Sequence, residues 1–329
     1  MMKYFLSVLV ALCCGFSSVS LAYDVGFKRV EVAPAGGAER FDMMVFYPTQ
    51  ADAKHVEFGP FHLSLAIGAP MAEGRFPLAV FSHGSGASPL SYNHIAVGLA
   101  SRGFIVAMPL HPGNNFRDNT RAGSVQNYTE RPKHISSAID FLLALAPVHN
   151  HIQSDKIAVL GHSVGGYTAL TVAGGVASTN TLLEQCLTNT LTDSYCLAAR
   201  AGGLKEVSIQ HPKDSRVKAL ALMAPVGVLF AADRELAAVD IPVLMLSAEF
   251  DQVLTTRYNA AVIANGLPDA TLLTHEVIAN AGHFSFLTTF PDALKVELGP
   301  VAKDPDGFDR AEFQQVLVAK LAQWLDSVL

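Results

Sequence analysis

Positive charge is scarce in this 329-residue sequence: 23 lysines and arginines stand against 29 aspartates and glutamates, which gives a formal net charge of −6. Charged residues make up only 16% of the chain, and the basic ones form no run. A nucleic-acid-binding protein usually carries a basic stripe or patch, so we expect no nucleic-acid partner. Apolar residues make up 50% of the chain, which excludes disorder for most of it.

Long hydrophobic runs are absent beyond the N-terminus. No stretch of eighteen apolar residues follows it, so we expect no integral membrane span in the mature protein. Residues 1–22 have the pattern of a signal peptide, with Lys3, an apolar segment over 4–16, and small residues at Ser20 and Ala22. The sequence therefore predicts an exported protein, periplasmic or secreted, whose mature chain covers residues 23–329.

Cysteine is rare, with four residues in all, and two of them lie inside the predicted signal peptide. Only Cys186 and Cys196 remain in the mature chain, and no CxxC motif suited to zinc includes them. In an oxidising compartment such an even pair favours a local disulfide. Two free buried thiols are the alternative.

Short apolar runs alternate with amphipathic segments along the mature chain. Runs of four to seven apolar residues are typical of strands buried on both faces of a parallel sheet. The helical spacing of Ile135, Ala138, Ile139 and Leu142 gives one apolar face, and a similar pattern follows Asp309. This alternation predicts an α/β fold with a mostly parallel central sheet and helices on both faces. The expected strands are 41–47, 78–81, 104–108, 157–160, 217–223, 243–246 and 271–278.

One polar stretch, residues 178–216, interrupts this alternation and contains both mature cysteines. We interpret it as a cap-like insertion over a site, and a surface loop without a functional role is the alternative. No internal repeat or low-complexity linker divides the chain, so the pattern indicates one domain with an insertion.

The sequence Gly161-His162-Ser163-Val164-Gly165-Gly166 follows an expected buried strand and precedes a helix of small residues. It is the only GxSxG match in the chain, and this context is typical of a nucleophile elbow. On such a turn the serine hydroxyl is exposed above the sheet. We therefore predict that Ser163 is a catalytic nucleophile.

An acid and a histidine follow Ser163 in the order that this chemistry requires. Asp251 comes after the expected strand 243–246, and His283 follows 271–278, so both lie at the carboxyl ends of strands. His283 would accept the Ser163 proton, and Asp251 would fix its tautomer. Glu249 is the alternative acid.

A serine hydrolase must also bind the oxyanion of its tetrahedral intermediate. The backbone N–H groups of Ser85, in the turn after the strand 78–81, and Val164 are the predicted donors. His111 and Phe284 are candidate pocket residues, although a structural loop histidine and a core aromatic are equally consistent with the pattern. His149 and His151 have a metal-ligand spacing without a carboxylate or cysteine nearby, so we expect no metal site.

Taken together, the motifs resemble those of α/β-hydrolases, in particular the dienelactone-hydrolase group related to platelet-activating-factor acetylhydrolases. The likeness covers residues 41–329 and rests on the motifs at 81–87, 109–113, 161–166 and 282–284. It implies a serine esterase without a cofactor. The expected substrate is a small-molecule or lipid-like carboxylic ester, cleaved through an acyl-enzyme.

The chain departs from that group at two positions. Dienelactone hydrolases use a cysteine nucleophile where this chain has Ser163, so their lactone substrate is not carried over. The acetylhydrolase branch has its acid after an earlier strand, where this chain reads Leu222-Met223-Ala224-Pro225 without a carboxylate. Acyl transfer through the same residues and a non-catalytic binding protein on this fold are the alternative functions.

Overall fold

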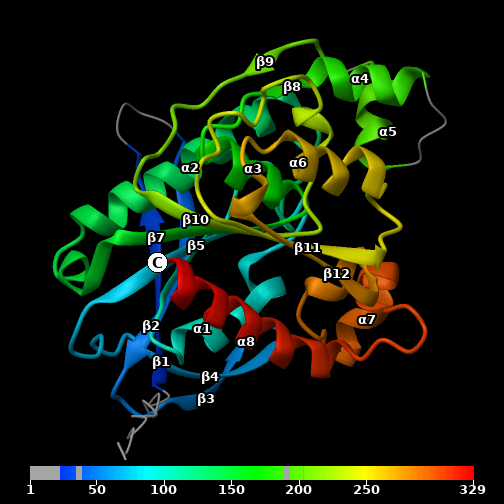
Figure 1. Cartoon of the computed structure of the whole chain (residues 1–329). Helices are drawn as coiled ribbons and strands as arrows, with labels where there is room; N and C mark the ends of the chain where they lie inside the picture. Colours follow the sequence, from blue (N-terminus) through cyan, green and yellow to red (C-terminus); the bar gives the residue numbers. More distant parts are fainter. Residues whose placement is uncertain (1–22, 35–38, 189–192, 203) are drawn as a thin grey trace, which may run out of the picture.

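A ten-stranded sheet crosses the centre of the computed structural model (Figure 1). The structure describes residues 23–34, 39–188, 193–202 and 204–329, so the predicted signal segment 1–22 lies outside the described residues. The strand order is β12-β11-β10-β7-β5-β6-β2-β1-β4-β3. The strands are β1 (Asp24–Val32), β2 (Phe41–Thr49), β3 (Lys54–Phe58), β4 (Phe61–Ile67), β5 (Phe76–Ser82), β6 (Ile105–Pro109), β7 (Ile152–His162), β10 (Val217–Met223), β11 (Val243–Phe250) and β12 (Leu273–Gly282).

Six neighbouring strands of this sheet pair in parallel, in the order β12-β11-β10-β7-β5-β6. This confirms the predicted mostly parallel α/β sheet. The chain enters this sheet through antiparallel pairs, β1 with β2 and β2 with β6, and the hairpin β3–β4 forms the opposite edge. The last strand begins at Leu273 and not at residue 271, because Asp269 caps a short 3₁₀ turn by accepting a hydrogen bond from the N–H of Thr271.

Helices cover both faces of the sheet (Figure 1). α2 (Val125–Ala144), α3 (Val164–Val172) and α6 (Ala260–Gly266) pack into one apolar cluster, and α1 (Asn93–Ala100) and α8 (Arg310–Val328) pack into the other. The Asp309 carboxylate accepts a hydrogen bond from the N–H of Glu312, as expected for the N-cap of α8. The core therefore consists of two layers separated by the sheet.

The described part of residues 178–216 includes a small helical layer above α3 and α6 (Figure 1). This layer contains α4 (Thr179–Thr188) and α5 (Tyr195–Arg200), and the short strands β8 (Ala177–Ser178) and β9 (Ser208–Ile209) close its base. The predicted disulfide joins Cys186 on α4 to Cys196 on α5. The remaining helix, α7 (Asp292–Leu298), lies beyond the carboxyl end of β12.

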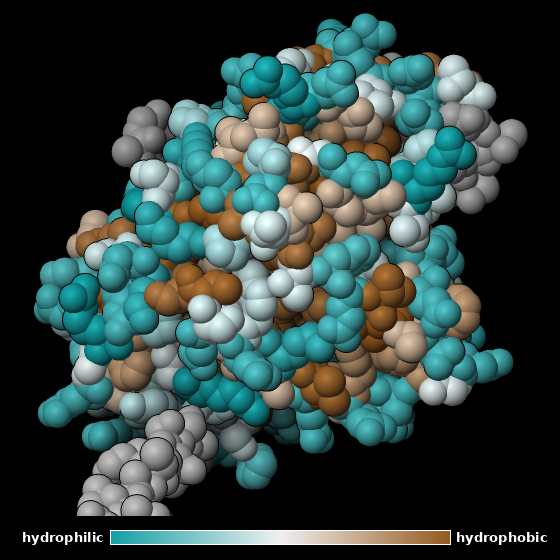
Figure 2. Space-filling view, viewed as in Figure 1, coloured by the Kyte–Doolittle hydropathy of each residue, from teal (hydrophilic) through white to brown (hydrophobic). Residues whose placement is uncertain are grey.

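On the face shown in Figure 2, apolar residues form small patches that polar residues separate. None of the helices in the described ranges combines the length and the apolar character needed to cross a bilayer.

Candidate active site

Ser163 lies on a sharp turn between β7 and α3, with backbone angles φ 56° and ψ −123°. A non-glycine residue rarely adopts a positive φ, so this turn is strained. The surrounding backbone holds it in place: the Ser163 N–H donates to the Met223 carbonyl at 3.0 Å, and its carbonyl accepts from Gly166 and Val226 at 2.9 and 3.0 Å. This turn places Ser163 directly after the carboxyl end of β7, where the residue lines two cavities.

The glycines of the turn are required by close backbone contacts. A Cβ at Gly161 would lie 2.1 Å from the Gly165 carbonyl oxygen, and a Cβ at Gly165 would lie 1.9 Å from the Ser82 carbonyl oxygen. A Cβ at Gly166 would lie 2.5 Å from the Pro225 side chain. No larger residue fits these positions without displacement of the backbone, so the GxSxGG pattern is a direct consequence of the packing.

His283 and Asp251 meet at the same edge of the sheet. The His283 Nδ1 lies 2.8 Å from the Asp251 Oδ2, and both side chains are almost entirely buried. The other carboxylate oxygen accepts hydrogen bonds from the N–H groups of Val253 and Leu254 at 2.9 and 2.8 Å, which fixes the orientation of the acid. Glu249 is exposed and instead accepts a hydrogen bond from the N–H of Asn280 at 2.8 Å.

The turn after β5 packs directly against the elbow, since a Cβ at Gly84 would lie 3.5 Å from the Ser163 Cβ. Ser85 and Val164 both line a cavity that includes Ser163. Within the described residues no protein group accepts a hydrogen bond from the N–H of either residue. Both N–H groups are therefore free to donate to a ligand oxygen, which is the property required of the predicted oxyanion donors.

The prediction that His111 lines the pocket is wrong for the cavities at Ser163. His111 is fully buried behind the turn, where its Nε2 lies 2.9 Å from the Ser82 hydroxyl and its Nδ1 lies 3.1 Å from the Nδ1 of His134. The loop after β6 turns inward, and these polar partners hold the imidazole beneath the surface. Phe284 lines a cavity that also includes His283.

A chain of hydrogen bonds connects the turn to the loop of His283. The His283 carbonyl can only accept, so the neutral His162 ring carries its proton on Nε2 and donates it to that carbonyl at 2.9 Å. The Nδ1 of His162 then accepts from the Tyr92 hydroxyl at 2.9 Å, and that hydroxyl accepts from the N–H of Gly84 at 3.1 Å. Burial lowers the pKa of His162 well below its usual value, so this ring is neutral.

Two cavities meet at Ser163. The first, of about 420 Å³, also includes His283, Phe284 and other mostly apolar side chains. The second, of about 350 Å³, lies under the insertion, which contributes Ser194, Tyr195 and Leu197 to its wall. A ligand that reacts with Ser163 therefore has separate space for the groups on its two sides.

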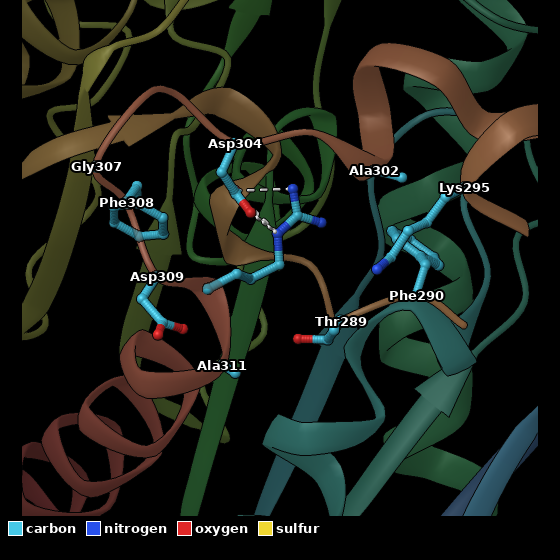
Figure 3. Close-up of a pocket in the computed structure, with 10 residues that line it drawn as sticks. Thr289, Phe290, Lys295, Ala302, Asp304, Gly307, Phe308, Asp309 and Ala311 are labelled. Carbon is cyan, nitrogen blue, oxygen red and sulfur yellow. Dashed lines mark hydrogen bonds and ion pairs between the residues drawn. The ribbon is translucent and has the colours of Figure 1, made fainter. Parts of the chain in front are cut away.

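A third cavity, of about 490 Å³, shares Phe290 with the first and contains none of the predicted catalytic residues. Figure 3 shows Asp304 there, with dashed contacts to a guanidinium and with Phe308 and Phe290 to either side. That guanidinium belongs to Arg310, whose Nε lies 2.9 Å from Asp304 and whose terminal nitrogen donates to the Val301 carbonyl at 3.2 Å. Phe290 and Val301 also line the first cavity, so this ion pair supports the wall of that cavity.

Sequence reasoning missed two buried polar groups around the site. Asp193, in the insertion, accepts hydrogen bonds from the N–H and hydroxyl of Thr255 at 2.8 and 2.6 Å, which ties the insertion to the loop of Asp251. Arg131, on α2, is fully buried behind the elbow. Arg131 precedes Ile135 by four residues and so lies on the apolar face of α2. A charged residue on an otherwise apolar helix face is the sequence signal that would have pointed to Arg131.

Five histidines whose pKa values are lowered should make folding stability depend on pH. Burial is the largest cause that lowers the pKa of His83, His94 and His134 to about 3, and it holds the pKa of His111 and His162 well below the usual value. In the unfolded chain these groups titrate near about 6.5, so below that pH the unfolded state binds more protons. We expect the free energy of unfolding to fall as pH decreases from about 6.5 towards 3, by up to about 1.4 kcal/mol per pH unit for each histidine.

Urea unfolding at several pH values between 7.5 and 4.5 measures this dependence. His134→Gln should reduce the slope of unfolding free energy against pH, because it removes one of the buried groups. His149→Asn, at an exposed histidine, is the matched control and should leave the slope unchanged. Equal slopes in the wild type and in His134→Gln would contradict the assignment of a neutral buried histidine.

Comparison with known proteins finds similarity to several proteins named as hydrolases. The Chlorophyllase family matches residues 43–188, which is less than half of the chain. Platelet-activating factor acetylhydrolase of Canis lupus familiaris is 32% identical over 146 residues, 31% of this chain and 33% of that protein. Bis(hydroxyethyl) terephthalate hydrolase of Streptomyces coelicolor is 23% identical over 75% of this chain and 62% of that protein. The chain thus spans about a third of the acetylhydrolase and under two thirds of the terephthalate hydrolase.

A solved structure extends the likeness to nearly the whole chain. Ferulic acid esterase from Streptomyces cinnamoneus superposes with a TM-score of 0.66 over 95% of this chain and 91% of its own, at 17% sequence identity. Identity at this level shows a shared fold. The elbow, the parallel sheet and the helices on its two faces are the elements that the α/β-hydrolase fold requires.

Proposed function

Because this chain is an α/β-hydrolase that fits the dienelactone-hydrolase-like group, we propose that it is a serine hydrolase of carboxylic esters. One observation carries the proposal: Ser163, on a strained turn, lines the same cavity as His283, whose Nδ1 lies 2.8 Å from the Asp251 carboxylate. The names of three relatives, an acetylhydrolase, a terephthalate hydrolase and an esterase, support ester hydrolysis.

In this mechanism His283 takes the proton of Ser163 while the serine oxygen attacks the ester carbonyl. Asp251 keeps the proton of the neutral imidazole on Nδ1 and stabilises the imidazolium that forms. The N–H groups of Ser85 and Val164 bind the oxyanion. His283 then protonates the leaving alcohol, and water releases the acid from the acyl-enzyme by the same steps in reverse.

The two cavities support a substrate with a substantial group on each side of the ester bond. The mostly apolar first cavity, with Phe284 and Phe290 in its wall, suits an acyl or aromatic group. The second, under the disulfide-linked insertion, would take the other group. We also propose export: a disulfide is typical of oxidising compartments, and residues 1–22 have the signal-peptide pattern. N-terminal sequencing of the mature protein tests this, with Tyr23 as the expected start.

Two measurements on the wild-type protein test the proposed activity. A fluorophosphonate probe should label the protein at Ser163, and p-nitrophenyl esters of increasing chain length should be hydrolysed at rates that report the size of the cavities. A folded protein that is neither labelled nor active would favour a binding function. New esters formed in the presence of added alcohols, in place of the free acid, would indicate acyl transfer.

A further inference from the structure

One arginine is buried without a carboxylate beside it. Arg131 is fully buried, and among the residues that the structure describes it forms no ion pair. Among the described residues Arg310 is also deeply buried, and it pairs with Asp304 at 2.9 Å. Burial of an uncompensated charge is unfavourable, so the position of this guanidinium requires a physical explanation.

The guanidinium contacts neutral oxygens. Its nitrogens donate to the Thr168 hydroxyl at 3.1 Å, the Asn114 side-chain oxygen at 2.7 Å, the Ser82 hydroxyl at 3.1 Å and the His83 carbonyl. These acceptors satisfy the N–H groups but do not cancel the charge. Burial is the main cause that lowers the pKa of Arg131 to about 9, which leaves the group charged at neutral pH.

Two of these contacts lead to the two sides of the oxyanion hole. The Asn114 amide nitrogen donates to the Ser85 hydroxyl at 2.8 Å, and the Thr168 hydroxyl donates to the Val164 carbonyl at 2.9 Å. Each residue that offers an N–H to the oxyanion is therefore connected to Arg131 through one intervening side chain. The His83 carbonyl adds a direct contact to the turn that precedes Ser85.

We propose that Arg131 is the positioning residue of the oxyanion hole, which holds the Ser85 turn and the Val164 end of α3 in one geometry and places a positive charge behind them. The inference rests on the proposed function. Negative charge develops at this point in the transition state, and a fixed charge in a water-poor site stabilises it strongly because the site need not reorganise. The absence of a carboxylate beside Arg131 in the described residues leaves its field uncancelled.

Two threonines on α3 provide a matched test. Thr168 and Thr171 are both fully buried, and each donates to the carbonyl four residues earlier, at 2.9 and 3.0 Å. Only Thr168 also accepts a hydrogen bond from Arg131. Thr168→Val should reduce kcat about tenfold with KM nearly unchanged, less than the roughly 10²–10³-fold loss expected for a direct oxyanion donor. Thr171→Val should retain the wild-type kcat.

The binding affinity of a boronic acid inhibitor distinguishes a role of Arg131 in positioning the oxyanion hole from a general effect on the structure. Its boron forms a bond to the Ser163 oxygen, the serine proton passes to His283, and the tetrahedral adduct is anionic. Its affinity should fall in Thr168→Val by the same factor as kcat, and affinity for a neutral substrate analogue should not change. Equal losses in the two threonine variants, or an unchanged boronic acid affinity with reduced kcat, would overturn the proposal.

Arg131 itself can be tested in the same assays. Arg131→Met should lose about 10²–10³-fold in kcat, and Arg131→Lys, which keeps the charge but not the fork, should lose less. An Arg131→Met protein that folds and keeps the wild-type kcat would overturn the proposal. If these variants do not fold, the threonine pair decides. A wild-type protein without turnover would overturn both this inference and the proposed function. If the wild type is active, the variants test only the role of Arg131.

Discussion

Ser163→Ala is expected to fold normally and to lose about 10⁴–10⁶-fold in kcat. In the proposed mechanism the Ser163 hydroxyl attacks the ester, and the proposed oxyanion donors and the cavities, which stay in place, account for the residual rate. Alanine meets the same strained backbone as serine at φ 56°, so the change adds no new backbone strain. Steady-state rates on a p-nitrophenyl ester, with circular dichroism to confirm the fold, measure the effect.

Ser194→Ala is the matched control, because Ser194 lines both cavities at Ser163 but lies on the insertion. It should keep most of the activity. Ser163→Gly tests the strain separately: glycine adopts a positive φ at little cost, so this inactive variant should be about 1 kcal/mol more stable than Ser163→Ala. A Ser163→Ala enzyme that retains more than about a tenth of the wild-type rate would exclude Ser163 as the nucleophile.

The parallel part of the sheet was predictable because its signal is local and strong. The strand Ile105–Pro109, for example, is buried along its whole length, so it reads as a continuous apolar run. The elbow was predictable for the same kind of reason, since contacts shorter than 3 Å permit only glycine at positions 161, 165 and 166. Asp251 and His283 could be proposed from the sequence because each comes after an expected strand and because they follow Ser163 in the required order.

The N-terminal strands were harder to find because they lie near or at the antiparallel edge. The strand Lys54–Phe58 has exposed or partly exposed residues throughout, and the strand Asp24–Val32 mixes charged and apolar residues. Both strands pair with the next strand of the chain, but neither has the continuous apolar run that marks a buried strand. The partners of His111 and Arg131 are missed for a different reason: Ser82, Asn114 and Thr168 come together only when the sheet and helices pack.

Asp251→Asn is expected to keep the fold and to slow turnover by about 10⁴-fold. The carbonyl oxygen of the introduced amide can still accept the hydrogen bonds that the carboxylate accepts from the N–H groups of Val253 and Leu254. The amide nitrogen then faces the Nδ1 of His283, where the carboxylate oxygen lies at 2.8 Å in the wild type. Two donors cannot face each other, so the imidazole must place its proton on Nε2, where it can no longer accept the proton of Ser163.

Glu249→Gln is the control for this assignment, because Glu249 is the carboxylate two residues before Asp251, at the end of β11. The side-chain oxygen of the introduced glutamine can still accept the hydrogen bond from the N–H of Asn280, so this variant should keep most of the activity. Labelling by a fluorophosphonate should slow in Asp251→Asn in parallel with kcat, since both reactions need a serine activated by His283. A larger loss in Glu249→Gln than in Asp251→Asn would move the acid to Glu249. Unchanged labelling with reduced kcat would place the defect of Asp251→Asn after acylation, in the release of the acyl group.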